Sequence, residues 1–207
     1  MSIRRALLVI DVQNEYFTGN LRIEYPDVRV SLPNILRAMD AAQAAGIPVV
    51  VLQHIQAEDA AVFARGSEMA ALHPEVAARP HDLRVEKRLA SALAGTGLGE
   101  WLRARDIDTL SVVGYMTHNC DDSTVRQAYH EGWTVELLAD ATGALSYANA
   151  AGRASAEEIH RVFTVVQHTG FAAVLDTETW CARVARGEPA ERDGILASHR
   201  RALGQAG

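Results

Sequence analysis

A cysteine stands in this sequence where it could act as a nucleophile. Cys120 lies in the segment GYMTHNCDDST, where a strand-like apolar run ends at Gly114 and a helix is expected to begin at the cysteine. A helix N-terminus carries about half a positive charge, which favours a thiolate over a thiol. Free cysteine is also among the most buried residue types, so a structural Cys120 is an equal alternative on spacing alone.

Two further residues could complete a nucleophilic site. Asp11 ends an apolar run, where a carboxylate either caps a loop or acts as a base whose pKa the surroundings set. Lys87, in RVEKR, is typical of a surface lysine when it is taken alone. Together with Cys120, however, they could supply a base, an electrostatic stabiliser and an attacking sulfur.

The other candidates for thiol chemistry are weaker. Asp121 and Asp122 suit the start of a helix, but a carboxylate that faced the sulfur would raise the pKa of the thiol. We therefore expect both to point away from a reactive Cys120. Cys181, in TETWCARVAR, has no comparable setting and is interpreted as structural. A reducing compartment disfavours pairing of the two cysteines, so each is expected to be a free thiol.

The elements that must position these residues alternate between strand-like and helix-like periodicity, which is typical of an α/β fold. The sequence predicts strands at residues 6–12, 48–53, 109–114, 134–139 and 172–175. It predicts helices that begin at Ser31, near residue 98, at Cys120 and at Ser155, where Glu158 completes a capping box. Residues 54–84 lack strand character and are predicted to form a long loop, with a short helix around 60–72.

This alternation favours an open parallel sheet with helices on both faces. Ligands of such sheets bind beyond the carboxyl ends of the strands. Asp11 closes the first predicted strand and Cys120 follows the third. Both are therefore expected on the ligand-binding edge.

Composition limits the class of protein. The 207 residues, 48% of them hydrophobic, suit one domain over 1–207, in which 176–207 form a helical C-terminal tail. No apolar run approaches the roughly 18 residues of a membrane-spanning helix, and the start lacks the features of a secretory signal, so we expect a cytoplasmic protein without a membrane partner. The net charge of -6 shows no clusters of one sign, which argues against a nucleic-acid partner.

Three separated segments resemble the isochorismatase-like cysteine hydrolases, a family that includes nicotinamidases and N-carbamoylsarcosine amidohydrolase. They are IDVQNEYF (10–17), the run from VEKR to VRQA (85–128) and GWTVELLADA (132–141). The resemblance extends to about residue 173. It implies a three-layer α/β/α, Rossmann-like fold with an open, mainly parallel sheet, a homodimer or homotetramer, and Asp11, Lys87 and Cys120 as the catalytic triad.

The resemblance also implies the parts of the site that bind substrate. A cis peptide bond is expected between Tyr115 and Met116, where it would aim the amides of Met116 and Cys120 at one point and form an oxyanion hole. The walls of the pocket for a small-molecule substrate are expected to come from Phe17, His54, Tyr115 and His118.

Departures from the family pattern narrow the chemistry. Nicotinamidases carry a D-x-H motif that binds a divalent metal, whereas this chain reads LQHIQAED, with Gln53 and His54. We therefore expect no metal and no other cofactor, and nicotinamide is disfavoured. Isochorismatases that cleave a vinyl ether lack the cysteine, so Cys120 favours acyl chemistry. The expected reaction is hydrolysis of a C–N bond in a small amide, carbamoyl or related substrate through a thioester.

Two alternatives remain open at this level. One is a hydrolase of another bond, an ester or a vinyl ether. The other is a non-catalytic scaffold or thiol sensor, in which oxidants modify Cys120.

Overall fold

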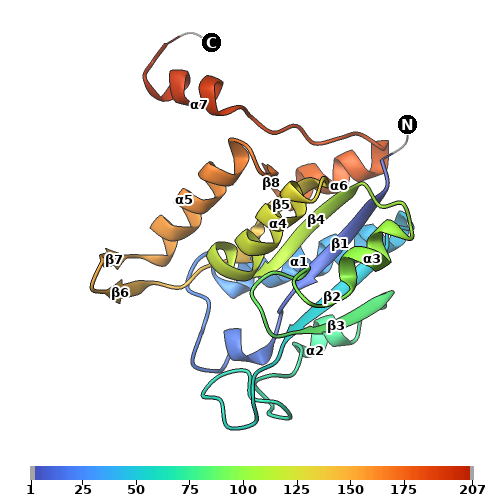
Figure 1. Cartoon of the computed structure of the whole chain (residues 1–207), viewed down its shortest axis with the longest axis vertical. Helices are drawn as coiled ribbons and strands as arrows, with labels where there is room; N and C mark the ends of the chain where they lie inside the picture. Colours follow the sequence, from blue (N-terminus) through green and yellow to red (C-terminus); the bar gives the residue numbers. More distant parts are fainter. Residues whose placement is uncertain (1–2, 206–207) are drawn as a thin grey trace.

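The computed structural model describes residues 3–205 and centres on a six-stranded sheet between layers of helices (Figure 1). The strand order is β3-β2-β1-β4-β5-β8, and every pairing is parallel. The strands are β1 (Arg5–Ile10), β2 (Val49–His54), β3 (Leu83–Lys87), β4 (Thr109–Tyr115), β5 (Thr134–Gly143) and β8 (Ala173–Leu175). This architecture confirms the predicted fold.

The central strands are buried on both faces, so their side chains feed two separate cores. Leu7 and Val9 of β1 point to one core, and Ala6, Leu8 and Ile10 point to the other. Helices α1 (Val28–Ala44) and α6 (Thr177–Arg186) cover the first face, while α3 (Leu98–Arg103) and α4 (Asp122–His130) cover the second (Figure 1). The remaining helices are α2 (Pro74–Ala77), α5 (Ala156–His168) and α7 (Ile195–Ala202).

Two predicted helix starts are wrong. Helix α1 begins one turn before Ser31, because the Asp27 carboxylate accepts the backbone N–H of Arg29 at 2.8 Å and caps it. Residues 60–72 form no helix. The short helix of this loop is α2, which begins at Pro74 because the His73 side chain accepts the N–H of Glu75. The capping box of Ser155 and Glu158 is confirmed at the start of α5.

The sequence analysis missed β3, the strand that ends at Lys87. Leu83, Val85 and Lys87 alternate with exposed Arg84 and Glu86, as in a strand at the edge of a sheet. Because a lysine occupies one of the inward positions, the apolar alternation is too short to be recognised. The sequence analysis also missed the antiparallel hairpin of β6 (Tyr147–Asn149) and β7 (Gly152–Ala154), which projects from the body beside α5 (Figure 1).

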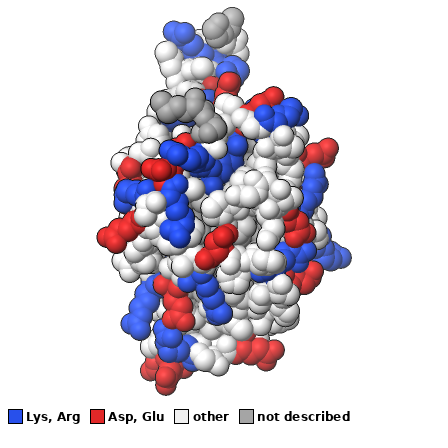
Figure 2. Space-filling model, turned by 90° about the vertical axis from the view of Figure 1, so that its right-hand side faces the viewer, with Lys and Arg blue, Asp and Glu red and all other residues white. Residues whose placement is uncertain are grey.

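The surface in view carries charges of both signs. Figure 2 shows basic and acidic side chains interspersed over the face in view. Among residues 3–205, none of the helices is both long and apolar enough to cross a membrane.

A buried polar network ties the sheet to the C-terminal part of the chain. Arg5 Nη2 lies 2.8 Å from Glu136 Oε1, and both side chains are almost wholly buried. Glu136 also accepts hydrogen bonds from the Ser111 hydroxyl at 2.7 Å and the Trp180 indole at 2.8 Å. Arg5 donates in addition to the Glu188 carbonyl at 2.6 Å. The network therefore joins β1, β4 and β5 to α6 and to the segment after it.

Removing the arginine should destabilise the fold, because it leaves the Glu136 carboxylate buried without its counter-ion. We expect Arg5→Ala to lower the free energy of unfolding by about 3–5 kcal/mol in urea denaturation. Arg4→Ala is the matched control, since Arg4 forms only an exposed ion pair with Asp106 at 3.6 Å and should cost about 1 kcal/mol or less. Equal losses in the two variants would contradict this role of the network.

Candidate active site

The carboxyl ends of three strands bring Asp11, Lys87 and Cys120 together. Asp11 directly follows β1, Lys87 ends β3, and Cys120 lies in the turn after β4. Lys87 Nζ is 2.6 Å from Asp11 Oδ2 and 3.2 Å from Cys120 Sγ. The side chains of the lysine and the aspartate are 0% exposed, and the cysteine is 4% exposed. The three residues predicted from the sequence therefore form one buried cluster.

The backbone at this edge is shaped for the cluster. Asp11 adopts a left-handed conformation, with φ of 51°, which is uncommon outside glycine and is tolerated best by Asp and Asn. On the neighbouring strand, a Cβ on Gly114 would collide with the carbonyl of Ile10, so only glycine allows β4 to approach β1 there. The predicted cis peptide bond between Tyr115 and Met116 is present.

Burial controls the state of the thiol. Residues Thr117–Asp121 form a π-helical turn, so Cys120 lies within that turn and α4 begins just after it, at Asp122. Burial raises the pKa of Cys120, nearby Asp11 raises it further, and Lys87 opposes both. Burial and Asp11 thus favour the thiol, against the effect expected of a helix terminus. The resting cluster holds a thiol, a carboxylate and an ammonium, which together carry no net charge.

Lys87 is held in its charged form. Burial lowers the pKa of the ammonium, but its close contacts with Asp11 and Cys120 outweigh this effect, so the pKa is raised overall. Lys87 Nζ also donates to the Leu89 carbonyl at 3.2 Å. Lys87 is the only lysine among the 20 Lys and Arg residues of the chain. That a single compact ammonium occurs among so many guanidinium groups is a signal that the sequence analysis did not use.

The two aspartates after Cys120 differ. Asp122 points away, as expected, and pairs with Arg126 at 2.8 Å while accepting the Gln167 amide at 2.9 Å. Asp121 is wholly buried, and neither of its carboxyl oxygens has a hydrogen-bond partner within residues 3–205. Burial raises the pKa of Asp121, and Asp11 raises it further. These surroundings therefore favour the neutral form of Asp121 over a second negative charge near the thiol.

Two of the predicted pocket residues, Phe17 and Tyr115, are aromatic neighbours. Phe17 is half-buried and packs on His73, with 4.3 Å between the ring centroids. Tyr115 is wholly buried in the core, and its hydroxyl bonds to the Ser31 hydroxyl at 2.8 Å. Phe17 meets Tyr115 edge-on at 5.9 Å. The structure thus places Tyr115 behind Phe17, as support and not as an exposed wall.

The third predicted pocket residue, His54, adjoins the lysine. His54 Nδ1 lies 3.5 Å from Lys87 Nζ, and burial together with that positive charge lowers the pKa of His54. The side chain of Gln13 fixes the His54 backbone by accepting its N–H at 2.8 Å and donating to its carbonyl at 2.9 Å. Gln13 is itself wholly buried, so it orients the end of β2.

The fourth, His118, belongs to a cluster that the sequence analysis missed. His118 Nε2 lies 2.9 Å from the hydroxyl of Tyr147, which comes from the β6–β7 hairpin and also reaches Met116 Sδ at 3.9 Å. Burial lowers the pKa of His118 to about 4, so its imidazole is neutral. In the same turn, Thr117 Oγ1 lies 3.0 Å from Nδ1 of His160 on α5. The hairpin and α5 therefore support the turn that carries Cys120.

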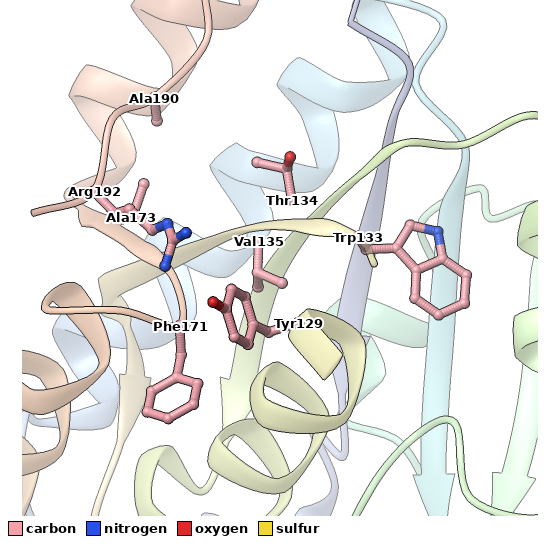
Figure 3. A pocket seen from close by; sticks show the side chains of 8 residues that line it. All are labelled: Tyr129, Trp133, Thr134, Val135, Phe171, Ala173, Ala190 and Arg192. Carbon is pink, nitrogen blue, oxygen red and sulfur yellow. The ribbon is translucent and has the colours of Figure 1, made fainter. Parts of the chain in front are cut away.

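Two cavities lie at opposite edges of the sheet. A cleft of about 330 Å³ reaches Lys87 and is also lined by Arg65 and Arg88. A smaller cavity of about 130 Å³ is shown in Figure 3, between the amino-terminal ends of β5 and β8 and the tail segment that carries Arg192. Within residues 3–205, the His, Cys, Asp and Glu side chains form no group of three or more that could hold a metal ion.

Comparison with known proteins gives consistent matches. Residues 5–179 match the family described as the isochorismatase domain. A crystal structure titled as an isochorismatase from Burkholderia xenovorans is 59% identical, covers 98% of both chains and has a TM-score of 0.97. A ureidoacrylate amidohydrolase of Methylobacterium radiotolerans is 29% identical, and the match covers 82% of this chain and 75% of that one. A secreted isochorismatase effector of Verticillium dahliae is 33% identical over 137 residues, 66% of this chain and 71% of that one.

Neutralising Asp11 should lower the pKa of the Cys120 thiol. In Asp11→Asn the buried Lys87 ammonium loses its counter-ion, so a thiolate becomes the anion that balances it. We therefore expect alkylation of Cys120 by iodoacetamide to begin at lower pH than in the wild type, as followed by peptide mapping across a pH series. Unchanged pH dependence would contradict the electrostatic coupling of the three groups.

Proposed function

Because the chain belongs to the isochorismatase family of hydrolases, we propose that it cleaves a C–N bond in a small amide, carbamoyl or ureido substrate through a thioester on Cys120. The family membership confirms the predicted hydrolase. The observation that carries the proposal is the buried contact of Lys87 Nζ with both Asp11 Oδ2 and Cys120 Sγ. The relative named as a ureidoacrylate amidohydrolase supports a substrate of this class.

In the first half of the reaction, the thiol is activated only as it attacks. Cys120 Sγ forms a bond to the substrate carbonyl carbon while its proton passes to Asp11. Oδ2 of Asp11 lies against Lys87 Nζ at 2.6 Å, whereas Oδ1 has no hydrogen-bond partner within residues 3–205 and is available for that proton. The carbonyl oxygen becomes an oxyanion, which the backbone N–H groups of Met116 and Cys120 stabilise, each by about 3 kcal/mol. Asp11 then passes the proton to the nitrogen as the C–N bond breaks.

In the second half, water releases the acyl group. Asp11 accepts a proton from the water while the water oxygen bonds to the thioester carbonyl carbon. Collapse of this intermediate breaks the C–S bond, and the proton returns from Asp11 to the sulfur. Lys87 remains an ammonium throughout and lowers the energy of whichever neighbour is anionic, the carboxylate or the sulfur.

The state of Cys120 argues against the alternative of a thiol sensor. Redox-sensing cysteines are accessible and have a low pKa, because the thiolate is the form that oxidants attack. Cys120 is 4% exposed, and burial raises its pKa. A thiol with its base alongside suits turnover of a bound substrate better than capture of a diffusing oxidant.

Activity should depend on one of the two cysteines. In a screen of small amides, ureides and lactams for ammonia release, Cys120→Ala should abolish turnover and retain the wild-type melting temperature. Cys181→Ala should keep turnover close to that of the wild type, because Cys181 lies on α6, away from the triad. Turnover of any screened substrate by folded Cys120→Ala would refute the thioester route for that substrate.

Lys87 should be needed as a compact ammonium. We expect Lys87→Ala to lose at least about a hundredfold in kcat, the scale at which acid–base and electrostatic groups commonly contribute. Lys87→Arg should not restore kcat, because a planar guanidinium does not fit the space between carboxylate and sulfur. Arg88→Ala, at an exposed neighbouring position, should leave kcat nearly unchanged. The proposed role fails if folded Lys87→Ala retains the wild-type kcat.

A further inference from the structure

Two aromatic rings form one corner of the small cavity shown in Figure 3. Tyr129, near the end of α4, and Phe171, just before β8, meet at 85° with 5.5 Å between their ring centroids. Val135 of β5 and Ala173 of β8 add aliphatic surface beside the rings. The cavity of about 130 Å³ is close in size to an apolar cavity of about 150 Å³ that binds benzene. Its size and lining therefore suit a ligand with a single flat ring.

Arg192 adds an uncompensated positive charge to this corner. Its guanidinium carbon lies 4.9 Å from the centroid of the Tyr129 ring, and Figure 3 shows the side chain extending from the tail toward that ring. Arg126 also stacks on an aromatic ring, that of Phe171 at 4.4 Å, but Asp122 neutralises it. Arg192 forms no ion pair within residues 3–205, and none of the residues that line the cavity is acidic. Its guanidinium is therefore free to pair with an anion.

Hydrogen bonds fix the tail segment that carries Arg192. On one side of it, the Glu188 carbonyl accepts a hydrogen bond from the buried Arg5 at 2.6 Å. On the other side, the Asp193 N–H donates to the His168 carbonyl at 2.9 Å. Arg192 thus stands on backbone that is anchored before and after it. Less conformational freedom is lost when such a residue meets a ligand, which favours binding.

We propose that this cavity is a second binding site, for a small carboxylate that carries one aromatic ring. The ring packs into the corner between Tyr129 and Phe171, where two nearly perpendicular rings offer a third ring both stacked and edge-on contacts. The carboxylate pairs with Arg192, whose planar guanidinium donates two parallel hydrogen bonds to such a group. The ring and the charge of the ligand thus each have a partner on the protein.

The proposed site is separate from the catalytic cluster and does not depend on the proposed hydrolase reaction. The cavity lies at the amino-terminal ends of β5 and β8, whereas Asp11, Lys87 and Cys120 lie at the opposite edge of the sheet. Strand β4 crosses the sheet between these edges in seven residues. At roughly 3.3 Å per residue, the edges are about 20 Å apart. A ligand in this cavity therefore leaves the catalytic cluster free.

The first test is an NMR titration of the ¹⁵N-labelled full-length chain with benzoate. We expect saturable shifts of the amide signals of residues 133–135 and 171–173, with a Kd of about 1 mM or tighter. Arg192→Gln should weaken binding at least about tenfold, because the charge-assisted hydrogen bonds are lost. The matched control is Arg200→Gln, at an exposed arginine of α7 outside the cavity, which should keep the wild-type Kd. A wild type that does not bind benzoate, or equal binding by Arg192→Gln, would overturn the proposal.

The second test separates the two parts of the ligand and locates the site. Acetate, which lacks the ring, and benzyl alcohol, which lacks the charge, should each bind at least about tenfold more weakly than benzoate. Cys120→Ala should bind benzoate with the wild-type Kd, because the catalytic edge is remote from the cavity. Acetate binding as tight as that of benzoate would refute the role of the aromatic corner. Loss of benzoate binding in folded Cys120→Ala would assign the binding to the catalytic site and refute a second site.

Discussion

The ion pair of Lys87 with Asp11 is the constraint on which the rest of this site depends. The two charged atoms are 2.6 Å apart, and neither side chain is exposed. A buried charge costs several kcal/mol unless its counter-ion is held in good geometry. The chain meets this condition through the sheet: β2 lies between β1 and β3, and parallel register ends all three strands at one edge. The strand pairing that stabilises this edge of the sheet therefore also holds Asp11 and Lys87 in the geometry that the site needs.

Charge balance also explains why the resting site favours the protonated form of Cys120. With one ammonium and one carboxylate in place, a thiolate would add an unbalanced negative charge, so burial and Asp11 hold the proton on Cys120. Burial and Asp11 likewise raise the pKa of Asp121, which disfavours a further negative charge there. Each step of the proposed cycle moves one proton between sulfur, carboxylate and substrate, and none changes the net charge of the buried cluster. Because water is excluded from the cluster, the charges within it interact more strongly than they would in solution.

Much of this arrangement could be predicted from the sequence, for identifiable reasons. Apolar runs and turn residues located the central strands, and spacing with family resemblance selected Asp11, Lys87 and Cys120. Strand β3 was missed because its inward pattern ends in a lysine. Local sequence indicates the helix dipole at Cys120 but not the depth of burial, which raises the pKa of the thiol. The contact of Tyr147 with His118 joins residues 29 apart through a hairpin without an apolar pattern, so no local signal indicated it.

The most direct test of this account is the titration of Lys87 itself. Because the chain contains one lysine, selective ¹⁵N labelling of lysine gives a single side-chain ammonium signal in NMR spectra. The account predicts that the Lys87 pKa lies above the ordinary lysine value in the wild type, since the contacts with Asp11 and Cys120 outweigh burial. In Asp11→Asn the same signal should titrate at a lower pH than in the wild type. A wild-type Lys87 that titrates at or below the ordinary value, unaffected by Asp11→Asn, would contradict the account.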